Sequence, residues 1–544
     1  MARKAWIMPV FIVALAAGHG GTWSSSKSCQ ADGPSAQRQS SKKRAESTKI
    51  PPPTWPPSAT TLNLDESTVA LLRRLVRERA ALLKPQDLAR LPDESKALRP
   101  LRGSGGSAVA DTTGRPLPRP NQDGAVLPGE RSAAADLFRW FPQRPESESF
   151  RLKRDGYHSD VSVGASGRLD WVFSVAASSL DKEPARRLEG YDSTQQSYEL
   201  FVPPGYKPDH AYPLILHVDP GGRSNGWRIW RTICQRHGVF FAGPHQAGNE
   251  GGVERPVRRR IVLDVLDDVR HRYLIDPDRT YLTGISGGGN TAARIAYALP
   301  ELFGGLAAIV GTWGMRPEHW LRQRAAERLS VALLTGEFDF NRNELELEYF
   351  PFIKDHGVRS MLRVYSRIGH QAPNPAQLEE VFQWLEADLP ARRRSAQRFP
   401  ASRLPGPATP EEWSRALLVE VADRLQTPDG LAMAIFLLEG VIERWPGTPA
   451  AKFSQELLRE FDANSSALSS DITKSEKLRY AYLQAVCHDS SYAAGPPAGY
   501  PIPWTGRTQI AIECWNDVLR LAPSGSDVAR KAQTRLDTLR KALN

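Results

Sequence analysis

A serine between glycines is the first feature of the sequence with chemical potential. Residues 284–288 read Gly-Ile-Ser-Gly-Gly, after a strand-like run at 280–283 and before a segment of helical periodicity at 291–299. A serine hydroxyl is a poor nucleophile unless a sharp turn between a strand and a helix exposes it to a base. Such a turn leaves room only for glycine two positions before and two positions after the serine. The spacing therefore predicts that Ser286 is a nucleophile.

An acid and a base are expected to follow the serine, each in the loop after a strand. The apolar run 331–335 leads into a loop with Glu337 and Asp339, and the run 360–365 leads into a loop with His370. We favour Asp339 over Glu337 because it lies two residues further out of its strand, toward the expected edge of the site. In this order of residues, His370 would take the proton of the serine, and Asp339 would orient the imidazole and stabilise its charged form.

Backbone N–H groups must also stabilise the negative charge that develops on the oxygen of the substrate. The N–H of Gly287, at the start of the helix behind the serine, is the expected first donor. The second donor is expected in the loop at 219–223, after the apolar run 214–218. The proline of this loop has no N–H, which leaves positions 221, 222 and 223. Of these we favour Gly222.

The elements that position these residues have the pattern of a wound α/β sheet. From residue 150 to 390, short apolar runs alternate with helical periods. Continuous apolar runs at 213–218 and 239–242 are typical of strands covered on both faces. Apolar residues at every second position of 169–175 indicate a strand with one buried face. His217 falls inside an apolar run, so we interpret it as a hydrogen-bonded core histidine rather than a ligand.

The stretch from 264 to 288 resembles the α/β-hydrolase esterases of the feruloyl esterase and polyhydroxybutyrate-depolymerase type. The similarity is most specific in Ile-Asp-Pro-Asp-Arg at 275–279, followed by Tyr-Leu-Thr-Gly at 281–284. It extends over about residues 190–390. The chain departs from the family after the oxyanion strand, where the family commonly has His-Gly and this sequence has His217 followed by Val-Asp-Pro-Gly-Gly.

This resemblance implies an α/β-hydrolase fold with a triad of Ser286, Asp339 and His370 that acts on carboxylic esters without a cofactor. Trp227 and Trp313 are candidates to line a pocket for an aromatic or sugar-bearing ester, with packing in the core as the alternative. No phosphate-binding loop and no metal-ligand spacing is found in the sequence. We therefore expect neither a cofactor nor a metal.

The four cysteines are too few and too scattered for a disulfide framework or a CxxC metal site. They are Cys29, Cys234, Cys487 and Cys514. A bridge between Cys487 and Cys514 is one interpretation, and free buried thiols are the favoured one.

Residues 1–18 have the features of a signal peptide. Arg3 and Lys4 precede an apolar run at 5–17, which is too short to span a bilayer and suits a secretory h-region. We therefore expect export to the periplasm or the extracellular space and no transmembrane segment. Cys29 lacks the preceding residues of a lipobox, so lipid anchoring there is the weaker alternative.

Residues 19–149 are rich in Ser, Lys, Pro and Gly, and we predict that they are mostly a disordered tether. A helix near 65–83 is the exception, because Val69, Leu72 and Val76 share one helical face. It is either a docking helix or, as we favour, a marginal helix on a flexible arm.

A Pro- and Arg-rich stretch at 391–407 is predicted to be a linker, and residues 408–544 an all-helical domain. Segments 434–446 and 511–523 echo each other, each with Ala-Ile near its start and proline at its end. The echo is similar to tetratricopeptide-like helix pairs, whose stacks usually bind protein partners. Plain packing against the rest of the chain is the alternative.

The net charge of +10 is concentrated near the N-terminus. Residues 1–150 hold 22 basic and 14 acidic side chains and so account for eight of the ten net charges. A globally basic surface for nucleic acid is therefore not expected.

The sequence as a whole predicts an exported serine esterase for a small-molecule or polysaccharide-linked ester. A serine peptidase of the prolyl-oligopeptidase type is one alternative, since it shares the order Ser, Asp, His. Such peptidases carry a large propeller domain, however, and no blade-length repeats precede residue 150. A non-catalytic binding protein on a hydrolase scaffold is the other alternative, suggested by the departure at the oxyanion strand and by the helical C-terminal region.

Overall fold

The computed structural model describes most of the chain from residue 151 onward and two short segments before it. The described residues are 66–80, 110–111, 151–164, 191–249, 255–403, 410–427, 430–464, 468–495 and 505–543. The chain divides into two units, 1–48 and 49–544, and all described residues belong to the second. The predicted signal peptide, Cys29, most of the predicted tether and the strand expected at 169–175 lie outside the described residues.

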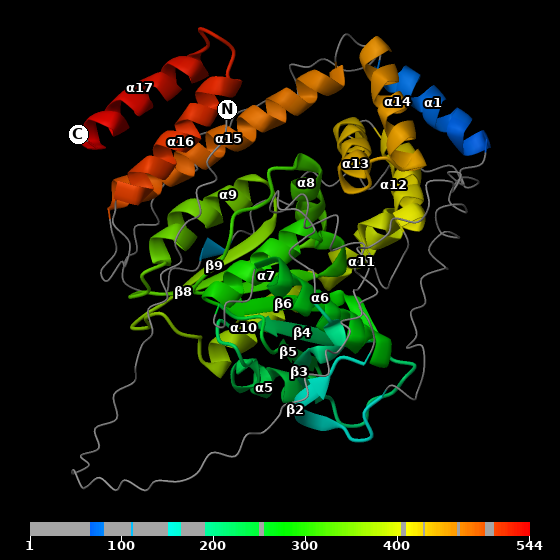
Figure 1. Ribbon diagram of the computed structural model, residues 1–544, viewed down its shortest axis with the longest axis vertical. Helices are drawn as coiled ribbons and strands as arrows, with labels where there is room; N and C mark the ends of the chain where they lie inside the picture. Colours follow the sequence, from blue (N-terminus) through cyan, green and yellow to red (C-terminus); the bar gives the residue numbers. More distant parts are fainter. Residues whose placement is uncertain are drawn as a thin grey trace, which may run out of the picture. The chain divides into compact units, whose positions relative to one another are not determined.

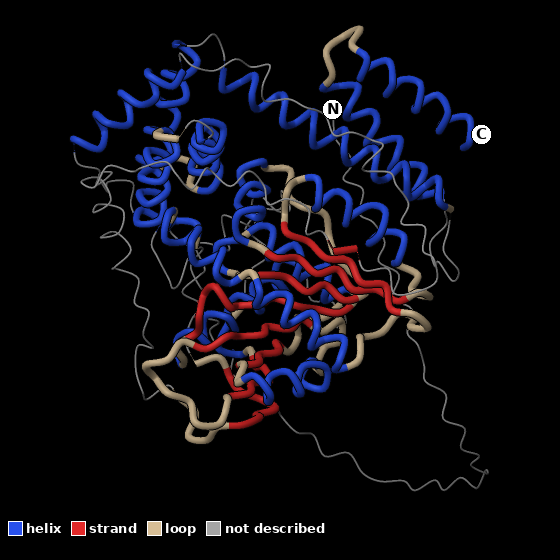
Figure 2. Tube along the Cα trace, turned by 180° about the vertical axis from the view of Figure 1, so that it is seen from behind, coloured by secondary structure: helices blue, strands red, loops and turns tan. Residues whose placement is uncertain are grey.

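A nine-stranded sheet organises the central part of this unit (Figures 1 and 2). Its order is β1-β9-β8-β7-β6-β4-β5-β3-β2. The six strands from β5 to β9 along this order run parallel, whereas β1, β2 and β3 are antiparallel to their neighbours. The strands are β1 (Ala110–Asp111), β2 (Gly156–Ser162), β3 (Ser197–Val202), β4 (Tyr212–Val218), β5 (Phe240–Pro244), β6 (Ile275–Ile285), β7 (Gly305–Ile309), β8 (Ser330–Gly336) and β9 (Arg359–Tyr365).

Helices cover both faces of the sheet, which explains why its inner strands are apolar without interruption. Every residue of β5, β7 and β8 is buried. One face packs on α5 (Gly226–His237) and α10 (Pro375–Ala387). The other packs on α6 (Arg255–Arg272), α7 (Gly287–Ala298), α8 (His319–Arg328) and α9 (Phe350–Asp355). The prediction of a wound α/β sheet is confirmed.

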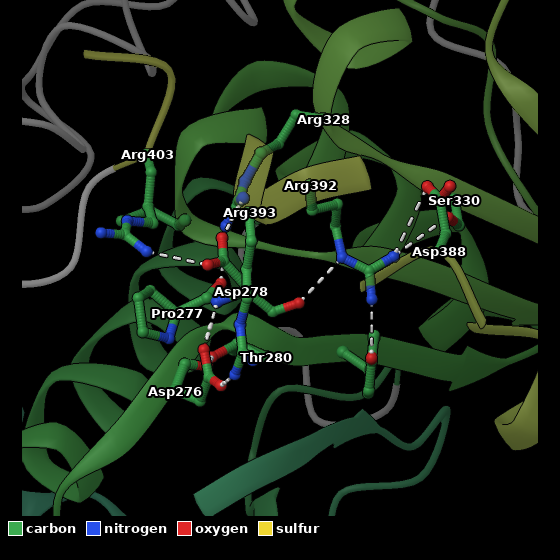
Figure 3. A network of polar contacts seen from close by, with 12 residues as sticks. Asp276, Pro277, Asp278, Thr280, Arg328, Ser330, Asp388, Arg392, Arg393 and Arg403 are labelled. Carbon is green, nitrogen blue, oxygen red and sulfur yellow. Dashed lines mark hydrogen bonds and ion pairs between the residues drawn. The ribbon is translucent and has the colours of Figure 1, made fainter. Parts of the chain in front are cut away.

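The structure corrects the linker predicted at 391–407 for residues 391–403, while 404–407 lie outside the described residues. The described stretch begins inside α11 (Leu389–Arg398) and continues into a 3-10 turn at Pro400–Ser402. Arg392 explains the difference, because its buried guanidinium donates to the Asp278 carbonyl at 2.9 Å and to the Tyr281 hydroxyl at 2.9 Å. Figure 3 shows this network, in which arginines after the last strand reach back to the beginning of β6. Charged residues that look like a linker in sequence are therefore ion-paired parts of the fold.

Further helices follow, as predicted for residues 408–544. They are α12 (Pro410–Leu425), α13 (Leu431–Arg444), α14 (Pro449–Asn464), α15 (Leu468–Ala494), α16 (Thr505–Leu521) and α17 (Asp527–Leu543). The two echoed segments form the last parts of α13 and α16 and the residues directly after them. Each is followed by a turn that contains a glycine of positive φ, Gly447 at 85° and Gly525 at 72°. Two helix pairs of similar design therefore account for the echo, while the similarity to tetratricopeptide repeats stays a prediction.

Buried ion pairs join α12 and α13 to the sheet domain. Arg324 on α8 is fully buried and donates twice to the Glu420 carboxylate on α12, both times at 3.0 Å. Arg444 on α13 lies 3.2 Å from the fully buried Glu301 carboxylate. Such pairs need both partners in place, because a single buried charge is costly. These helices are consequently packed as part of the same body.

Helices α15, α16 and α17 have a small core of their own, which includes Trp515 and Leu536. Cys487 and Cys514 lie on α15 and α16 as free thiols, as does Cys234 on α5, which agrees with the favoured interpretation. No helix among the described residues is both long and apolar enough to cross a bilayer.

The helix expected near 65–83 is present as α1 (Glu66–Ala80), and it is docked rather than free. Leu72 and Val76 are fully buried in the large core that also includes α12 and α14. Arg73 donates to Glu460 at 2.7 Å and to Glu456 at 3.0 Å, both on α14. The favoured interpretation of this helix as part of a flexible arm is thereby corrected, since its apolar face has a partner far away in the sequence.

Candidate active site

Ser286 stands on the turn between β6 and α7, as the glycine spacing predicts. Its backbone has φ 54° and ψ −123°, a left-handed conformation that costs energy for any residue other than glycine. The turn is held by a hydrogen bond from the Ser286 N–H to the Ile309 carbonyl at 2.8 Å. The strained backbone raises the side chain above the carboxyl end of the parallel strands.

The glycines around the serine are required by close backbone contacts. A Cβ atom at Gly284 would overlap with the backbone of Gly288, and one at Gly288 would overlap with the Val218 carbonyl at the end of β4. Further along the turn, a Cβ at Gly289 would overlap with the Gly311 carbonyl. The turn is therefore packed directly against the ends of the two strands beside it.

Ser286, His370 and Asp339 form a continuous chain of hydrogen bonds from three separate loops. His370 Nε2 lies 2.9 Å from Ser286 Oγ, and His370 Nδ1 lies 2.8 Å from Asp339 Oδ1. A carboxylate only accepts hydrogen bonds, so Nδ1 carries the imidazole proton and Nε2 can accept the serine proton. The Asp339 side chain is fully buried, whereas 21% of the His370 side chain is exposed, where a substrate can reach it.

Three residues around the acid and base were missed in the sequence. Thr335 Oγ1 donates to Asp339 Oδ2 at 2.6 Å, and the Asn341 N–H donates to Asp339 Oδ1 at 3.0 Å. The Phe340 ring stacks on the His370 imidazole, with 4.1 Å between ring centroids and an interplanar angle of 19°. The contact with Asn341 follows a known turn signal, because aspartate side chains commonly accept a hydrogen bond from the N–H two residues on. The stacking of Phe340 on His370 depends on the fold of the loop.

Glu337, the rejected alternative acid, has a different task. Its carboxylate accepts a hydrogen bond from the Arg367 N–H at 2.9 Å, and so ties the loop of the acid to the loop of the base. The Phe338 N–H also donates across these loops, to the Ile368 carbonyl at 2.9 Å. These two hydrogen bonds fix the loop of Asp339 to the loop of His370, in addition to the contact between the two side chains.

The two expected oxyanion residues, Gly287 and Gly222, lie in different surroundings. Gly287 directly follows the serine, and the side-chain amide of Asn249 lies against its Cα, where a Cβ would overlap with it. Gly222 accepts a hydrogen bond from the Gln246 N–H at 2.6 Å, so its part of the loop is tied to the loop after β5. The backbone that lies against the serine turn is the carbonyl of Val218 at the end of β4, which faces Gly288.

The two tryptophans also lie in different surroundings. Trp313 follows β7 at the carboxyl edge of the sheet, and the guanidinium of Arg294 lies 3.5 Å from its ring centroid. Trp227 stacks on Tyr157, with 5.0 Å between ring centroids, and on Phe201, with 4.7 Å, so β2 and β3 supply its neighbours. Of the two rings, Trp313 is therefore the one on an active-edge loop.

His217 is the buried core histidine that the sequence analysis expected. It is fully buried in β4, and its Nδ1 accepts a hydrogen bond from Trp230 Nε1 at 3.3 Å. Burial lowers the pKa of His217 to about 4, because the charged imidazolium would lose its hydration. Elsewhere in the described ranges, no group of three or more His, Cys, Asp or Glu side chains is arranged to hold a metal ion.

The strand order from β2 to β9, with a nucleophile-type turn after β6, defines the α/β-hydrolase fold.

No protein-family model matches the chain, and no curated protein is similar to it in sequence. Solved structures with similarity to it include a thermostable esterase (22% identity, TM-score 0.29). The matched region covers 35% of this chain and 59% of the length of that esterase. A ferulic acid esterase (15% identity, TM-score 0.28) shares 37% of this chain and 93% of its own. An S-formylglutathione hydrolase from Staphylococcus aureus (11% identity, TM-score 0.29) shares 36% and 90%. These scores are low, so the fold assignment depends on the strand order of this chain itself.

Proposed function

We propose that this protein is a serine hydrolase that cleaves carboxylic esters through an acyl-enzyme on Ser286. The observation that carries the proposal is the hydrogen-bond chain from Ser286 Oγ through His370 to the buried Asp339 carboxylate. A serine with an adjacent base, itself oriented by a carboxylate, is an activated nucleophile. The left-handed backbone of Ser286 supports the same role.

In the proposed reaction, His370 accepts the proton of Ser286 as Oγ attacks the ester carbonyl carbon. The tetrahedral intermediate collapses, the bond to the alcohol oxygen breaks, and His370 returns the proton to the leaving alcohol. Water then attacks the acyl-enzyme with His370 as base, which releases the acid and restores the serine. Asp339 keeps Nδ1 protonated and stabilises the imidazolium in both steps.

The oxyanion is stabilised by the N–H of Gly287 and by a second N–H in the loop after β4. Gly222, whose carbonyl accepts the Gln246 N–H at 2.6 Å, is the proposed second donor through its own N–H. Trp313, on the loop after β7, is the proposed substrate-side residue.

Labelling with a fluorophosphonate and hydrolysis of short-chain nitrophenyl esters test the proposal together. We expect the probe to modify Ser286 and the esters to be cleaved, while a panel of peptides is not. Ser286→Ala should lose labelling and lower ester turnover at least about a thousandfold. Turnover of Ser286→Ala near the normal rate would refute the triad, cleavage of peptides instead of esters would favour a peptidase, and no labelling of the folded protein would favour a binding protein.

We also propose that the protein is exported, on the basis of the apolar run at 5–17 after two basic residues. Fractionation of cells that express the full chain tests this, and a protein found wholly in the cytosol with an intact N-terminus would refute it. A protein partner for the C-terminal helices is a further proposal, supported by the repeated helix pairs.

A further inference from the structure

The segment that follows the acid of the site is fastened to helices from the far C-terminus. It runs from Asn341 through η6 (Glu344–Tyr349), a π-helix, before α9 begins. Figure 1 shows α15 running over α9, and the partners of the segment lie on α15, just after it, and on α16. The contacting residues lie 152 positions apart in the pair Asn343–Gly495 and 159 apart in the pair Glu348–Arg507, so the contact is purely tertiary.

Arg507 on α16 makes the strongest part of this contact. Its Nη1 donates to both carboxylate oxygens of Glu348, at 2.9 and 3.1 Å, and its Nη2 is paired with Glu344. Residues 344 and 348 both point at one guanidinium, so the arginine spans the π-helix. A guanidinium that contacts two carboxylates in this way fixes their geometry as well as their charge.

The contact is buried, which makes it sensitive to the loss of either partner. The Glu348 side chain is 2% exposed and that of Arg507 10%. His488 on α15 lies with its Nδ1 2.9 Å from Glu348 Oε2 and completes the surroundings of this carboxylate. Removal of one charge from such a group leaves the other desolvated without compensation.

A second tie lies closer to the acid. Asn343 Nδ2 donates to the Gly495 carbonyl, just after the end of α15, at 3.0 Å. Asn341 is held on the sheet side, where its Nδ2 donates to the Val310 carbonyl at 2.8 Å and its N–H donates to Asp339 Oδ1. The four residues between the acid and η6 are consequently held on both sides.

We propose that Arg507 is a positioning residue for Asp339, which makes the α15–α16 helices part of the working site. This rests on the proposed function, since it presumes that Asp339 orients His370. Arg507 holds η6, η6 holds the turn at 339–343, and the turn keeps Asp339 Oδ1 2.8 Å from His370 Nδ1. A π-helix beside a functional residue fits this role, because such wide turns occur frequently at functional sites.

The test compares Arg507→Met with Arg535→Met in the full chain. Arg535 on α17 is the matched control, because it pairs with a carboxylate of α15 itself, that of Asp489, at 2.6 Å. Asn343→Ala breaks the second tie and serves if Arg507→Met fails to fold. The readouts are kcat and KM on a nitrophenyl ester, the rate of fluorophosphonate labelling at Ser286, and the melting temperature.

We expect Arg507→Met to lower kcat and the labelling rate by about tenfold to a hundredfold, with KM changed less than about twofold, since small misplacements of catalytic groups have effects of this size. Asn343→Ala should lower kcat by about threefold to tenfold, and Arg507→Lys should restore part of the loss. Arg535→Met should keep the wild-type kcat even where it lowers the melting temperature.

Two failures are distinguishable. If wild-type protein is labelled at Ser286 and folded Arg507→Met and Asn343→Ala are labelled and turn over at wild-type rates, the positioning role is refuted and the triad stands. Equal losses of kcat in Arg507→Met and Arg535→Met also refute it, because the effect would then be one of general stability. If wild-type protein is neither labelled nor active on any ester, the proposed function itself fails.

Discussion

Thr335 donates its hydroxyl hydrogen to the carboxylate oxygen of Asp339 that His370 does not use, at 2.6 Å. The two residues lie four positions apart, on either side of the end of β8. Because the Asp339 side chain is fully buried, this hydroxyl and the Asn341 N–H and His370 Nδ1 on the other oxygen offset the cost of burying a charge. The strand β8, which leads to the acid, therefore also supplies a hydrogen-bond donor to it.

Replacement of Thr335 by valine keeps the shape of the side chain and removes the donor. We expect Thr335→Val to lower kcat by about tenfold and the free energy of unfolding by about 1–3 kcal/mol, the usual range for a buried polar group left without its partner. Steady-state kinetics and urea unfolding measure the two effects. Thr335→Ser, which keeps the hydroxyl, should stay within about threefold of wild-type kcat, and an equally impaired serine variant would contradict the role of the hydrogen bond.

Asn249 is expected to affect the transition state more than substrate binding. Its side-chain amide lies against Gly287, whose N–H is the proposed oxyanion donor. Loss of this packing frees the turn that carries Ser286 and the Gly287 N–H to shift, and small misplacements of catalytic groups lower kcat strongly, so Asn249→Ala should lower kcat about tenfold with KM little changed. A rise in KM at constant kcat would instead place Asn249 in the binding of the ground state.

The buried His217 makes stability depend on pH. In the unfolded chain its pKa is near 6.5, and in the folded protein burial lowers it to about 4. The unfolded state therefore binds the extra proton between these values, and the free energy of unfolding decreases as pH falls from about 6.5 toward 4. From pH 7 to pH 5 this group alone accounts for a loss of about 2 kcal/mol.

His217→Asn removes this titration and keeps an acceptor for the Trp230 N–H. We expect the variant to lose less stability than the wild type between pH 7 and pH 5, as measured by urea unfolding at both values. Parallel losses in the two proteins would show that His217 does not carry a lowered pKa.

The docking of α1 is testable at Leu72, which is fully buried. Leu72→Ala should lower the free energy of unfolding by about 2–4 kcal/mol, as expected for a large-to-small change in a core. Arg74→Ala on the same helix is the control, because Arg74 is 64% exposed and pairs with Glu78 of its own helix, and it should change stability by less than about 0.5 kcal/mol. Equal, small effects of the two substitutions would restore the interpretation of a free helix.

The positions of Ser286, Asp339 and His370 could be predicted because each depends on local pattern. In a parallel sheet the carboxyl ends of the strands meet at one edge, so three loops after three strands converge without further information. Glycine at 284 and 288 likewise reports the crowding of a single turn. The acid could be separated from Glu337 by its place in the loop, and the structure gives Glu337 the Arg367 N–H as its partner.

What could not be predicted depends on contacts between distant segments. The Pro- and Arg-rich stretch near 391 has the composition of a linker, and only the carbonyl of Asp278 and the hydroxyl of Tyr281 make Arg392 a buried residue. The periodicity of α1 shows an apolar face but not the α14 surface that covers it.

The buried pairs of Arg324 with Glu420 and of Arg444 with Glu301 bear on how this protein can be dissected. A shortened version that stops after the sheet domain would remove the partners of Arg324 and Glu301. It would also expose to solvent the apolar surface that α12 and α13 cover. Expression trials should therefore retain at least α12 and α13, and chimeras with other proteins should carry both sides of each pair. For such work the sheet domain and these two helices form a single unit.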